Sequence, residues 1–453
     1  MAFRSRSESE VWDYLPDFAS QQLPRYTSYP PANRFSDDVD GEAARTARTA
    51  RTRLAPGAAI SLYVHIPFCK KLCWYCGCNT SVPTVADPVD TYIDALRAEI
   101  GLVAQDLPAG ARVTRIHFGG GSPDILLPAQ VERLFGAIRS NFELSPVADI
   151  AVELDPRGVS PELVQAFADA GLSRASLGVQ VLDPEVQARI NRIQPRMVIE
   201  SAIRMLRDAG VEGVNIDMMY GLPGQTLEHV VETATFASTQ DADRVAVFGY
   251  AHVPWMKKHQ KGIRPDDLPS GEARFQQAEA AARTLTRAGY MPIGFDHFAA
   301  PGDSLATAEQ HGQLHRNFQG YTDDACDALI GLGASAISSL PGLFYQNTAD
   351  TSAYRSTLSR AQSPVVRGLK PSQSDRRVGG VIERILCDFE ATLDADLRIA
   401  ACSSLAPFLH AGLVRLQGNH LSITARGRPY VRNVAACFDP DFVQKPTTHS
   451  LAI

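Results

Sequence analysis

The sequence of 453 residues lacks a long apolar run, a surplus of basic residues and an abundance of cysteine. No apolar run approaches the roughly 20 residues that a membrane-spanning helix needs, and residues 1–6 have no apolar segment of the kind that directs secretion. A formal net charge of −6 excludes a globally basic nucleic-acid binder. Eight cysteines in so long a chain argue against a disulfide framework and for a reducing compartment. These absences predict a cytoplasmic protein that binds neither membranes nor nucleic acids.

Half of the cysteines lie within ten residues, at 69–78. Cys69, Cys73 and Cys76 have the spacing C-x3-C-x2-C and directly follow the apolar run 60–66. Three thiolates from a short loop can hold three irons of a [4Fe–4S] cluster. The fourth iron then needs an external chelator, which the amino and carboxylate groups of S-adenosylmethionine can supply. Zinc sites usually use paired C-x2-C units, and a second pair is absent here. Cys78 is a fourth thiol that either tunes such a cluster or packs.

Strand-like and helix-like segments alternate from Ala59 onwards. The predicted strands are 60–66, 113–118, 149–154, 175–179, 214–218 and 244–250, and the predicted helices include 88–103, 128–141, 161–170, 197–209 and 227–239. Alternation with short connections indicates a parallel sheet. Six such units, or seven with 290–293, predict an α/β fold of the partial (βα)6 TIM-like barrel type. In such barrels functional residues lie at the carboxyl ends of the strands.

The sequence predicts four parts: an N-terminal extension (1–55), the partial barrel (56–300), a barrel-capping and substrate-site segment (301–358) and a mainly helical C-terminal domain (359–453). In the extension, Arg45 and Arg48 share one helical stripe, which we expect to be solvated. The polar and aromatic stretch 315–321 is predicted to be a loop, and 359–377 a boundary. The last part, two helices and a hairpin around Gly418-Asn419, resembles a winged helix. Without a basic recognition helix, it is predicted to be a structural lid.

Glycine and polar residues occur where the predicted strands end. Gly119-Gly120-Gly121 follows the second strand. Backbone without Cβ can approach a ligand closely there, and its amides can meet a carboxylate. Glu153 ends the third strand, where a carboxylate can hold ribose hydroxyls or an ammonium, or form a salt bridge. Asp217 interrupts an apolar run in the fifth strand and must find polar partners if it is buried. Their shared position predicts a site at this end of the barrel.

Together these motifs resemble the oxygen-independent coproporphyrinogen III oxidases, a family of the radical S-adenosylmethionine superfamily. The matching stretches are 25–30, 63–67, 69–79, 119–123, 153–157, 178–180, 215–223, 250–254, 315–321 and 335–338. The cysteine triad alone marks only the superfamily. The Cys-Gly-Cys-Asn extension at 76–79 and the His-Arg-Asn-Phe-Gln-Gly-Tyr stretch at 315–321 are the specific features.

The resemblance implies a [4Fe–4S] cluster on Cys69, Cys73 and Cys76 and two S-adenosylmethionine molecules side by side. The positions matching the site of the iron-chelating molecule are Tyr63, Gly120, Glu153, Ala251 and Ile337, and those for the second molecule are Tyr75, Gly121, Ser122, Gln180, Arg192 and Asp217. Phe318 and Gln319 are the implied catalytic residues near the second molecule and the substrate. Tyr75 and Ser122 replace the phenylalanine and threonine that the family often has, and they keep stacking area and a hydroxyl.

The reaction that the resemblance implies is the oxidative decarboxylation of two propionates of coproporphyrinogen III to vinyls, giving protoporphyrinogen IX in haem biosynthesis. A 5′-deoxyadenosyl radical removes a hydrogen from the propionate β-carbon, and the substrate radical loses CO2 and passes an electron to an acceptor. Four substrate carboxylates suit bidentate arginines, and Arg25, Arg192 and Arg316 are the candidates. An electron donor such as flavodoxin or ferredoxin and a monomeric state are also implied.

Two alternatives remain open from the sequence. A haem chaperone or an anaerobic haem-degrading relative would share the barrel and the cysteine triad, but the segments 25–30 and 315–321 favour the oxidase. A non-enzymatic metal or nucleic-acid module would use the cysteines structurally. The acidic balance and the polar residues at the strand ends oppose that second alternative.

Overall fold

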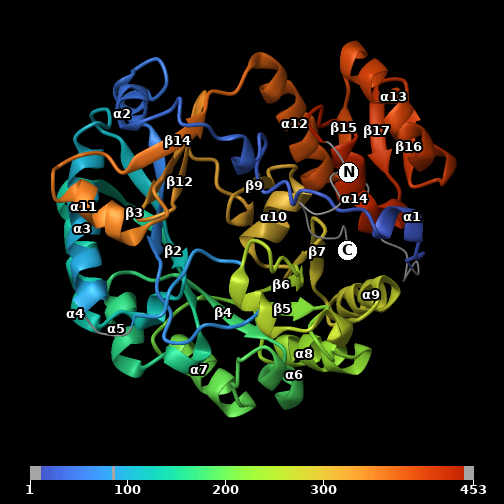
Figure 1. The fold of residues 1–453 in the computed structure, drawn as a ribbon, viewed down its shortest axis with the longest axis horizontal. Helices are drawn as coiled ribbons and strands as arrows, with labels where there is room; N and C mark the ends of the chain where they lie inside the picture. The colour runs from blue at the N-terminus through green and yellow to red at the C-terminus, as the bar shows by residue number, and fades with distance from the viewer. Residues whose placement is uncertain (1–11, 84–86, 443–453) are drawn as a thin grey trace.

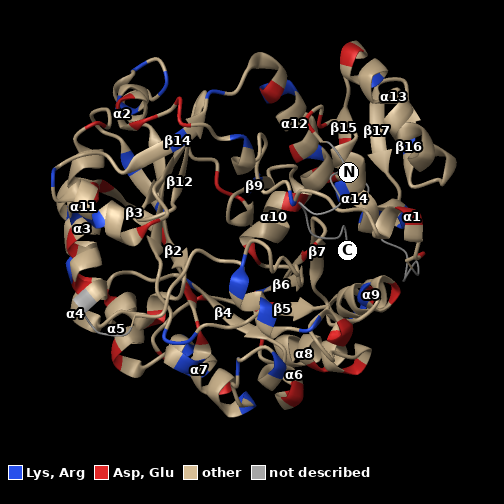
Figure 2. Cartoon of the chain, viewed as in Figure 1, with Lys and Arg blue, Asp and Glu red and all other residues tan. Residues whose placement is uncertain are grey.

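The computed structural model describes residues 12–83 and 87–442. In this part of the chain a sheet of 12 strands forms the centre, with the spatial order β14-β13-β12-β11-β1-β2-β3-β4-β5-β6-β8-β7. Helices cover the outside of the parallel strands, and Lys, Arg, Asp and Glu are interspersed over these helices (Figures 1 and 2). Among the described helices, none combines the length and the apolar character that a membrane crossing requires.

The six parallel strands and their helices confirm the predicted barrel. The strands are β1 (Ala59–Ile66), β2 (Arg112–Gly120), β3 (Glu143–Leu154), β4 (Arg174–Gln180), β5 (Gly213–Tyr220) and β6 (Arg244–Gly249), and the helices are α3 (Asp87–Ala104), α4 (Pro128–Asn141), α5 (Pro161–Asp169), α6 (Pro184–Arg189), α7 (Arg196–Asp208), α8 (Leu227–Thr239) and α9 (Gly271–Arg287). Side chains such as Val152, Leu177 and Ile216 are fully buried. Alternate positions on the same strands carry polar groups, because successive side chains of a strand point to opposite faces. Gly171 and Gly210 follow α5 and α7 with φ of 98° and 83°, as helix C-termini favour.

Antiparallel strands extend both edges of this sheet. β11 (Ala328–Leu332) is parallel to β1, and β12 (Ile337–Leu340), β13 (Leu343–Asn347) and β14 (Val365–Leu369) follow it antiparallel. At the other edge β8 (His297–Ala299) and β7 (Met291–Ile293) are also antiparallel. The possible seventh βα unit at 290–293 is therefore wrong, and the predicted boundary 359–377 contains a strand of the main sheet.

The shorter elements connect the sheet with both ends of the chain. They are α1 (Pro16–Ala19), η1 (Ala32–Arg34), α2 (Gly41–Thr49), η2 (Pro123–Ile125), η3 (Pro156–Gly158), η4 (Lys258–Gly262), η5 (Pro265–Asp267), α10 (Ser304–Gln310), β9 (His315–Asn317), β10 (Gly320–Thr322) and α11 (Thr351–Leu358). In α2, Arg45 is exposed and paired with Glu42. Arg48 is only 4% exposed and donates to Asp106 at 2.6 Å and to the Tyr345 hydroxyl at 3.1 Å. The prediction of a solvated stripe is therefore wrong for Arg48.

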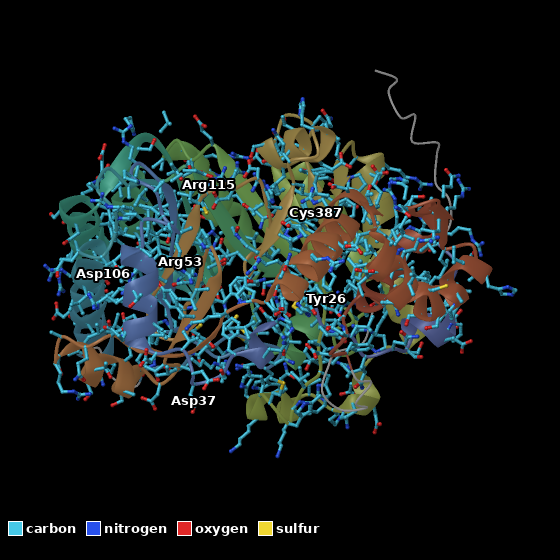
Figure 3. The ribbon with its side chains drawn as sticks, turned by 90° about the horizontal axis from the view of Figure 1, so that it is seen from above. Tyr26, Asp37, Arg53, Asp106, Arg115 and Cys387 are labelled. Atoms are coloured by element: carbon cyan, nitrogen blue, oxygen red, sulfur yellow. The ribbon has the colours of Figure 1, made fainter. Side chains whose placement is uncertain are left out.

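A second core joins the two ends of the chain. The C-terminal elements are α12 (Gln373–Asp388), β15 (Glu390–Thr392), α13 (Ala395–His410), β16 (Val414–Gln417), β17 (His420–Ile423), η6 (Ala425–Tyr430) and α14 (Val431–Ala436), and β16–β17 confirms the predicted hairpin. Leu23 and Tyr26 from the N-terminal segment pack into the same cluster as Ile385. The Tyr26 hydroxyl donates to Asp439 at 3.0 Å, and Tyr26 lies beside the C-terminal elements in Figure 3. The division of the chain into four parts stays a prediction.

Ion pairs and a hydrogen bond hold strands of the barrel toward their amino ends. Arg115 of β2 pairs with Asp323 at 2.6 Å, and the Ser61 hydroxyl of β1 donates to Asp324 at 2.5 Å. Arg244 at the start of β6 pairs with Asp303 at 2.8 Å. We call these residues the barrel floor. Arg115 lies on the side of the molecule opposite Asp37 (Figure 3). The carboxyl ends of the parallel strands, where the cysteine loop begins, are at the other end of the barrel.

Candidate active site

The loop 69–78 carries the cysteine triad and is fixed to neighbouring backbone on two sides. The Cys69 amide donates to the Ser81 carbonyl at 2.9 Å. On the other side, the Trp74 amide donates to the Ile190 carbonyl at 3.0 Å, and the Asn191 side chain donates to the Leu72 carbonyl at 2.8 Å. Asn191 adopts φ of 56°, which asparagine tolerates better than most residues. The loop is therefore positioned by the chain before any ligand is considered.

The segment after β6 holds the same loop from a third side. Lys257 donates to the Cys78 carbonyl at 2.8 Å, His259 hydrogen-bonds the Cys76 carbonyl at 2.8 Å, and Gln260 donates to the Tyr75 carbonyl at 3.0 Å. We call these three side chains the loop clasp. Because they bind backbone carbonyls, they fix the loop without using its thiols. These residues were not predicted from the sequence, although the polar run 257–261 follows a predicted strand.

Hydrogen-bond donors surround the thiols. Arg192 and Arg157 donate to the Cys73 sulfur at 3.4 Å and 3.5 Å, and Cys73 is only 6% exposed. The thiol of Cys78, acting against burial, lowers the pKa of Cys76 to about 6. Burial, by contrast, raises the pKa of Cys69 to about 12. The described residues contain no group of three or more His, Cys, Asp or Glu side chains able to hold one metal ion. In a [4Fe–4S] cluster each cysteine binds a separate iron. Cysteines that do not converge on one point fit such a cluster.

Polar side chains line the inner face of β1, β2 and β3. The Tyr63 ring stacks on His117 with 5.8 Å between ring centroids. His117 Nε2 lies 2.8 Å from Glu153 Oε1, and the Gly120 amide donates to Glu153 Oε2 at 3.3 Å. Burial raises the pKa of Glu153, but the hydrogen bond and charge of His117 hold it below its usual range. Since this side chain is 40% exposed, it presents an ionised carboxylate to open space, where it can accept from hydroxyl or ammonium groups.

His117 is a further site residue that the sequence did not lead us to predict. It stands between the buried Ile116 and Phe118. A polar residue between two buried neighbours on a parallel strand points away from the covering helices. This pattern of one polar residue between two apolar ones could have indicated that His117 faces the barrel interior.

A second group of predicted residues meets around Gly178 of β4. Arg192 donates to Asp155 at 2.9 Å and to the Gly178 carbonyl. A Cβ at Gly178 would lie 2.9 Å from both the Arg192 guanidinium and the Gln180 side-chain amide, which places those two side chains together. Gly178 is also paired in register with Asp217 of β5. The structure therefore brings Gln180, Arg192 and Asp217 to one position.

This second group contains buried polar atoms without a protein partner. Asn215 donates to Asp217 at 2.8 Å, but Asn215 Oδ1 finds no partner among the described residues, and neither does Arg192 Nε. Burial, and then the charge of Glu153, raise the pKa of Asp217 to about 6. Buried polar groups are nearly always hydrogen-bonded in complete structures. A polar ligand such as S-adenosylmethionine fits this position.

The turn at Gly119-Gly120-Gly121 differs from the expectation that its backbone amides bind a ligand carboxylate. The Gly121 amide donates to the Ile66 carbonyl and the Ser122 amide to the Phe68 carbonyl, both at 2.8 Å. Together with the Gly120 amide on Glu153, these donors are already used, so the expectation that they meet a ligand carboxylate is wrong. A Cβ at Gly120 would lie 2.4 Å from the His65 ring. Glycine is required here by packing against protein, and Ser122 is buried with its hydroxyl accepting from the Asp155 amide at 3.0 Å.

Ala251 and Tyr75 are joined through the loop clasp, and Ile337 lies near β1. Gln260 of the loop clasp donates to both the Ala251 carbonyl, at 3.2 Å, and the Tyr75 carbonyl. The Ile337 carbonyl lies against Gly331, which is paired in register with Tyr63.

The stretch 315–321 is a hairpin, and the prediction of a loop is wrong. β9 and β10 pair antiparallel, so Phe318 and Gln319 form the turn between them. The Phe318 ring contacts Phe344 of β13 at 6.1 Å between centroids, while Gln319 is exposed. No contact between described residues joins Gln319 to Glu153 or Arg192.

Arginines gather where the N-terminal segment, the hairpin and α14 meet. Arg25 is exposed and donates to the Gly249 carbonyl at 3.1 Å, and the buried Arg316 side chain lies over the Tyr321 ring at 4.5 Å. Burial, followed by the charge of Arg25, lowers the pKa of Arg432 to about 10. Asp296 is the carboxylate that acts on Arg25 and Arg432. Because these three arginines share the single carboxylate of Asp296, the group keeps an excess of positive charge that suits an anionic ligand.

Comparison with known proteins decides the family. A model of the Radical SAM superfamily matches residues 63–237. A protein of Bradyrhizobium diazoefficiens named oxygen-independent coproporphyrinogen III oxidase is 42% identical over 450 residues, which covers 97% of this chain and 99% of that protein. The chain belongs to this family. The Escherichia coli oxygen-independent coproporphyrinogen III oxidase is 39% identical over 432 residues, or 93% of each chain.

The solved structure of coproporphyrinogen III oxidase from Escherichia coli, described as a radical SAM enzyme, has the same fold as this family member. Its TM-score is 0.88 at 37% identity, covering 93% of this chain and 100% of that one. Radical SAM proteins use a [4Fe–4S] cluster and S-adenosylmethionine, and the donors around the cysteine loop fit both groups.

Proposed function

We propose that the chain converts coproporphyrinogen III to protoporphyrinogen IX without oxygen, as a step of haem biosynthesis. The observation that carries this proposal is the similarity to oxidases of that name over nearly the whole chain, including the hairpin and the C-terminal elements. A relative that shares only the radical SAM barrel would match over residues 63–237 alone. A haem chaperone or haem-degrading protein is therefore not favoured.

Cys69, Cys73 and Cys76 hold the cluster in this proposal, and two S-adenosylmethionine molecules bind beside it. When bound, these groups supply a 5′-deoxyadenosyl radical that can remove hydrogen from a propionate β-carbon. The proposal for two molecules is supported by two separate polar groups on the barrel wall. Tyr63, Gly120 and Glu153, with Ala251 and Ile337 beyond them, form the first site, and Tyr75, Gly121, Ser122, Gln180, Arg192 and Asp217 form the second.

The arginines near the β9–β10 hairpin bind the substrate carboxylates in this proposal. Arg25 and Arg316 keep this predicted role, and Arg432 joins them because it belongs to the same cationic group. Arg192 does not fit it, since its guanidinium already donates to Asp155, to the Gly178 carbonyl and to the Cys73 sulfur. Phe318 and Gln319, in the hairpin turn, contact the substrate and the second cofactor molecule.

Three further features complete the proposal. The chain acts as a monomer in the cytoplasm, where a reducing environment keeps its eight cysteines from forming disulfides. An external protein such as flavodoxin or ferredoxin supplies the electrons.

An anaerobic turnover assay tests the proposal. Reconstituted protein with dithionite, S-adenosylmethionine and coproporphyrinogen III is expected to yield a product lighter by two carboxyl groups. The matched variant Cys73→Ser is expected to lose both the cluster and this product. Tight haem binding by the unaltered protein, without any product, would instead support the chaperone.

A further inference from the structure

The surface around the cysteine loop is positively charged, although the chain as a whole is acidic. Residues 69–81 and 250–264 contain five lysines and one arginine, and neither segment contains an aspartate or a glutamate. Carboxylates outside the two segments pair with two of these cations, Asp267 with Arg264 at 2.7 Å and Asp124 with Lys70 at 3.6 Å, so the excess charge is carried by the other four lysines. The whole chain has a formal net charge of −6. Such a local reversal of sign creates a positive potential where the rest of the surface is mixed or negative.

The loop clasp places these two segments side by side. Lys257 and His259 bind the carbonyls of Cys78 and Cys76, so the lysines of the second segment flank the cysteine loop. Large apolar side chains lie among them: Trp255 is 52% exposed and Met256 65% exposed. We call the exposed residues Lys70, Lys71, Trp255, Met256, Lys258 and Lys261 the loop patch. Exposed aromatic and methionine side chains with a charged rim are typical of protein interfaces.

We propose that the loop patch binds an acidic protein that carries one electron at a time and delivers it to the cluster. This inference rests on the proposed function, which requires an external electron. In the transfer, the carrier is oxidised by one electron and the cluster is reduced by one. No covalent bond forms or breaks. The patch contains two residues of the cysteine loop and four from the segment that the loop clasp binds to that loop. A small charged area suits the small interfaces of electron-transfer complexes.

The partner is identified by charge and size. A carrier with an acidic rim around its redox centre is drawn to the lysines, and its centre then faces the cysteine loop. Attraction of this kind mainly raises the association rate and weakens with added salt.

A binding measurement tests the patch independently of turnover. The probe is an oxidised acidic flavodoxin, titrated into the full-length protein with and without its cluster. We expect binding that weakens as salt rises, and a Kd at least about tenfold weaker for the double variant Lys258→Glu/Lys261→Glu. The matched control Arg398→Glu/Arg415→Glu makes the same charge change at exposed positions of α13 and β16 and is expected to bind like the unaltered protein. Equal affinity of both double variants would overturn the inference.

Turnover with two reductants separates this inference from the proposed function. With reduced flavodoxin, we expect the Lys258→Glu/Lys261→Glu variant to lose at least about tenfold in rate. With dithionite, which needs no docking surface, it is expected to match the unaltered protein. An equal loss with both reductants would overturn the patch and assign these lysines to the site itself. Absence of product from the unaltered protein with dithionite would refute the function, and the binding titration would still decide the patch.

Discussion

At the residue scale, a few inward-facing side chains determine what the barrel can bind. Glu153 and Asp217 are both carboxyl groups on neighbouring parts of the wall, but their surroundings differ. His117 holds the pKa of Glu153 down, whereas burial and the charge of Glu153 raise that of Asp217 to about 6. One group is therefore an anion at neutral pH, and the other accepts a proton in mild acid.

Asp217→Asn is expected to change stability in a pH-dependent way. The folded pKa of about 6 exceeds the unfolded value of about 3.9. Ionisation of Asp217 therefore costs folding free energy as the pH rises through 6, and asparagine avoids this cost while keeping an acceptor for Asn215. The variant is expected to gain up to about 2 kcal/mol at pH 8, and little at pH 4. Urea unfolding without S-adenosylmethionine measures this, and a pH-independent difference would contradict it.

Gly120→Ala is expected to destabilise the fold by about 2 kcal/mol or more. Its φ of 110° is unfavourable for alanine, and the new Cβ would meet the His65 ring. Urea unfolding of Gly136→Ala provides the control, because that glycine lies inside α4 with nothing within 4 Å of a Cβ. There alanine is expected to stabilise by about 0.5–1 kcal/mol. Equal effects at the two positions would contradict the packing argument.

At the element scale, two properties decide whether a feature could be predicted from the sequence. One is the length of the helix or strand, and the other is how far apart in the sequence two contacting residues lie. β1 to β6 are buried and long enough for an apolar pattern, and their helices begin at clear signals such as Pro128 and Pro161. β9 and β10 have three residues each, too few for any period. Arg48 could not be predicted as buried, because Tyr345 is 297 residues away in the sequence. The loop clasp was missed for the same reason, since Lys257 lies 179 residues from Cys78.

The two arginines of α2 provide a matched test of burial. Arg48→Ala would leave Asp106, itself only 15% exposed, without its partner and would release α2 from β13. We expect a loss of about 3 kcal/mol in unfolding free energy. Arg45→Ala removes only an exposed pair with Glu42, so its effect is expected to stay below about 1 kcal/mol. Chemical denaturation of the two variants compares them, and similar losses would contradict the assignment of Arg48 as an anchor.

The hairpin turn is expected to matter for turnover but not for folding. Gln319 is exposed, so Gln319→Ala should keep the unfolding midpoint and the cluster absorbance. If the side chain contacts substrate, the rate of product formation falls by at least about tenfold, equivalent to one charge-assisted or neutral hydrogen bond. An unchanged rate in the anaerobic assay would remove Gln319 from the active site.

At the scale of the whole molecule, the N-terminal segment and the C-terminal elements pack into one shared core. The second core contains residues from both the N-terminal segment and the C-terminal elements. Asp439, which is 9% exposed, accepts hydrogen bonds from the hydroxyls of Tyr26 and Tyr29. The N-terminal segment also contains Arg25, so the attachment of this segment determines where Arg25 lies in the proposed substrate site.

Tyr26→Phe is expected to loosen this attachment. Loss of one of the two hydroxyl donors to a buried carboxylate should cost about 1–2 kcal/mol. Hydrogen exchange is expected to accelerate in residues 18–30 and in α14, with β1 to β6 still protected. Uniform acceleration throughout the sheet would show that Tyr26 supports the entire fold instead.

The barrel floor has a consequence for the order of assembly. Arg115 of β2 pairs with Asp323, which follows it by 208 residues in the sequence. Asp303 likewise pairs with Arg174 of β4 and with Arg244 of β6. These contacts can form only after the chain has been synthesised beyond residue 323, so the amino ends of the early strands are tied together late, when the parallel strands are already present.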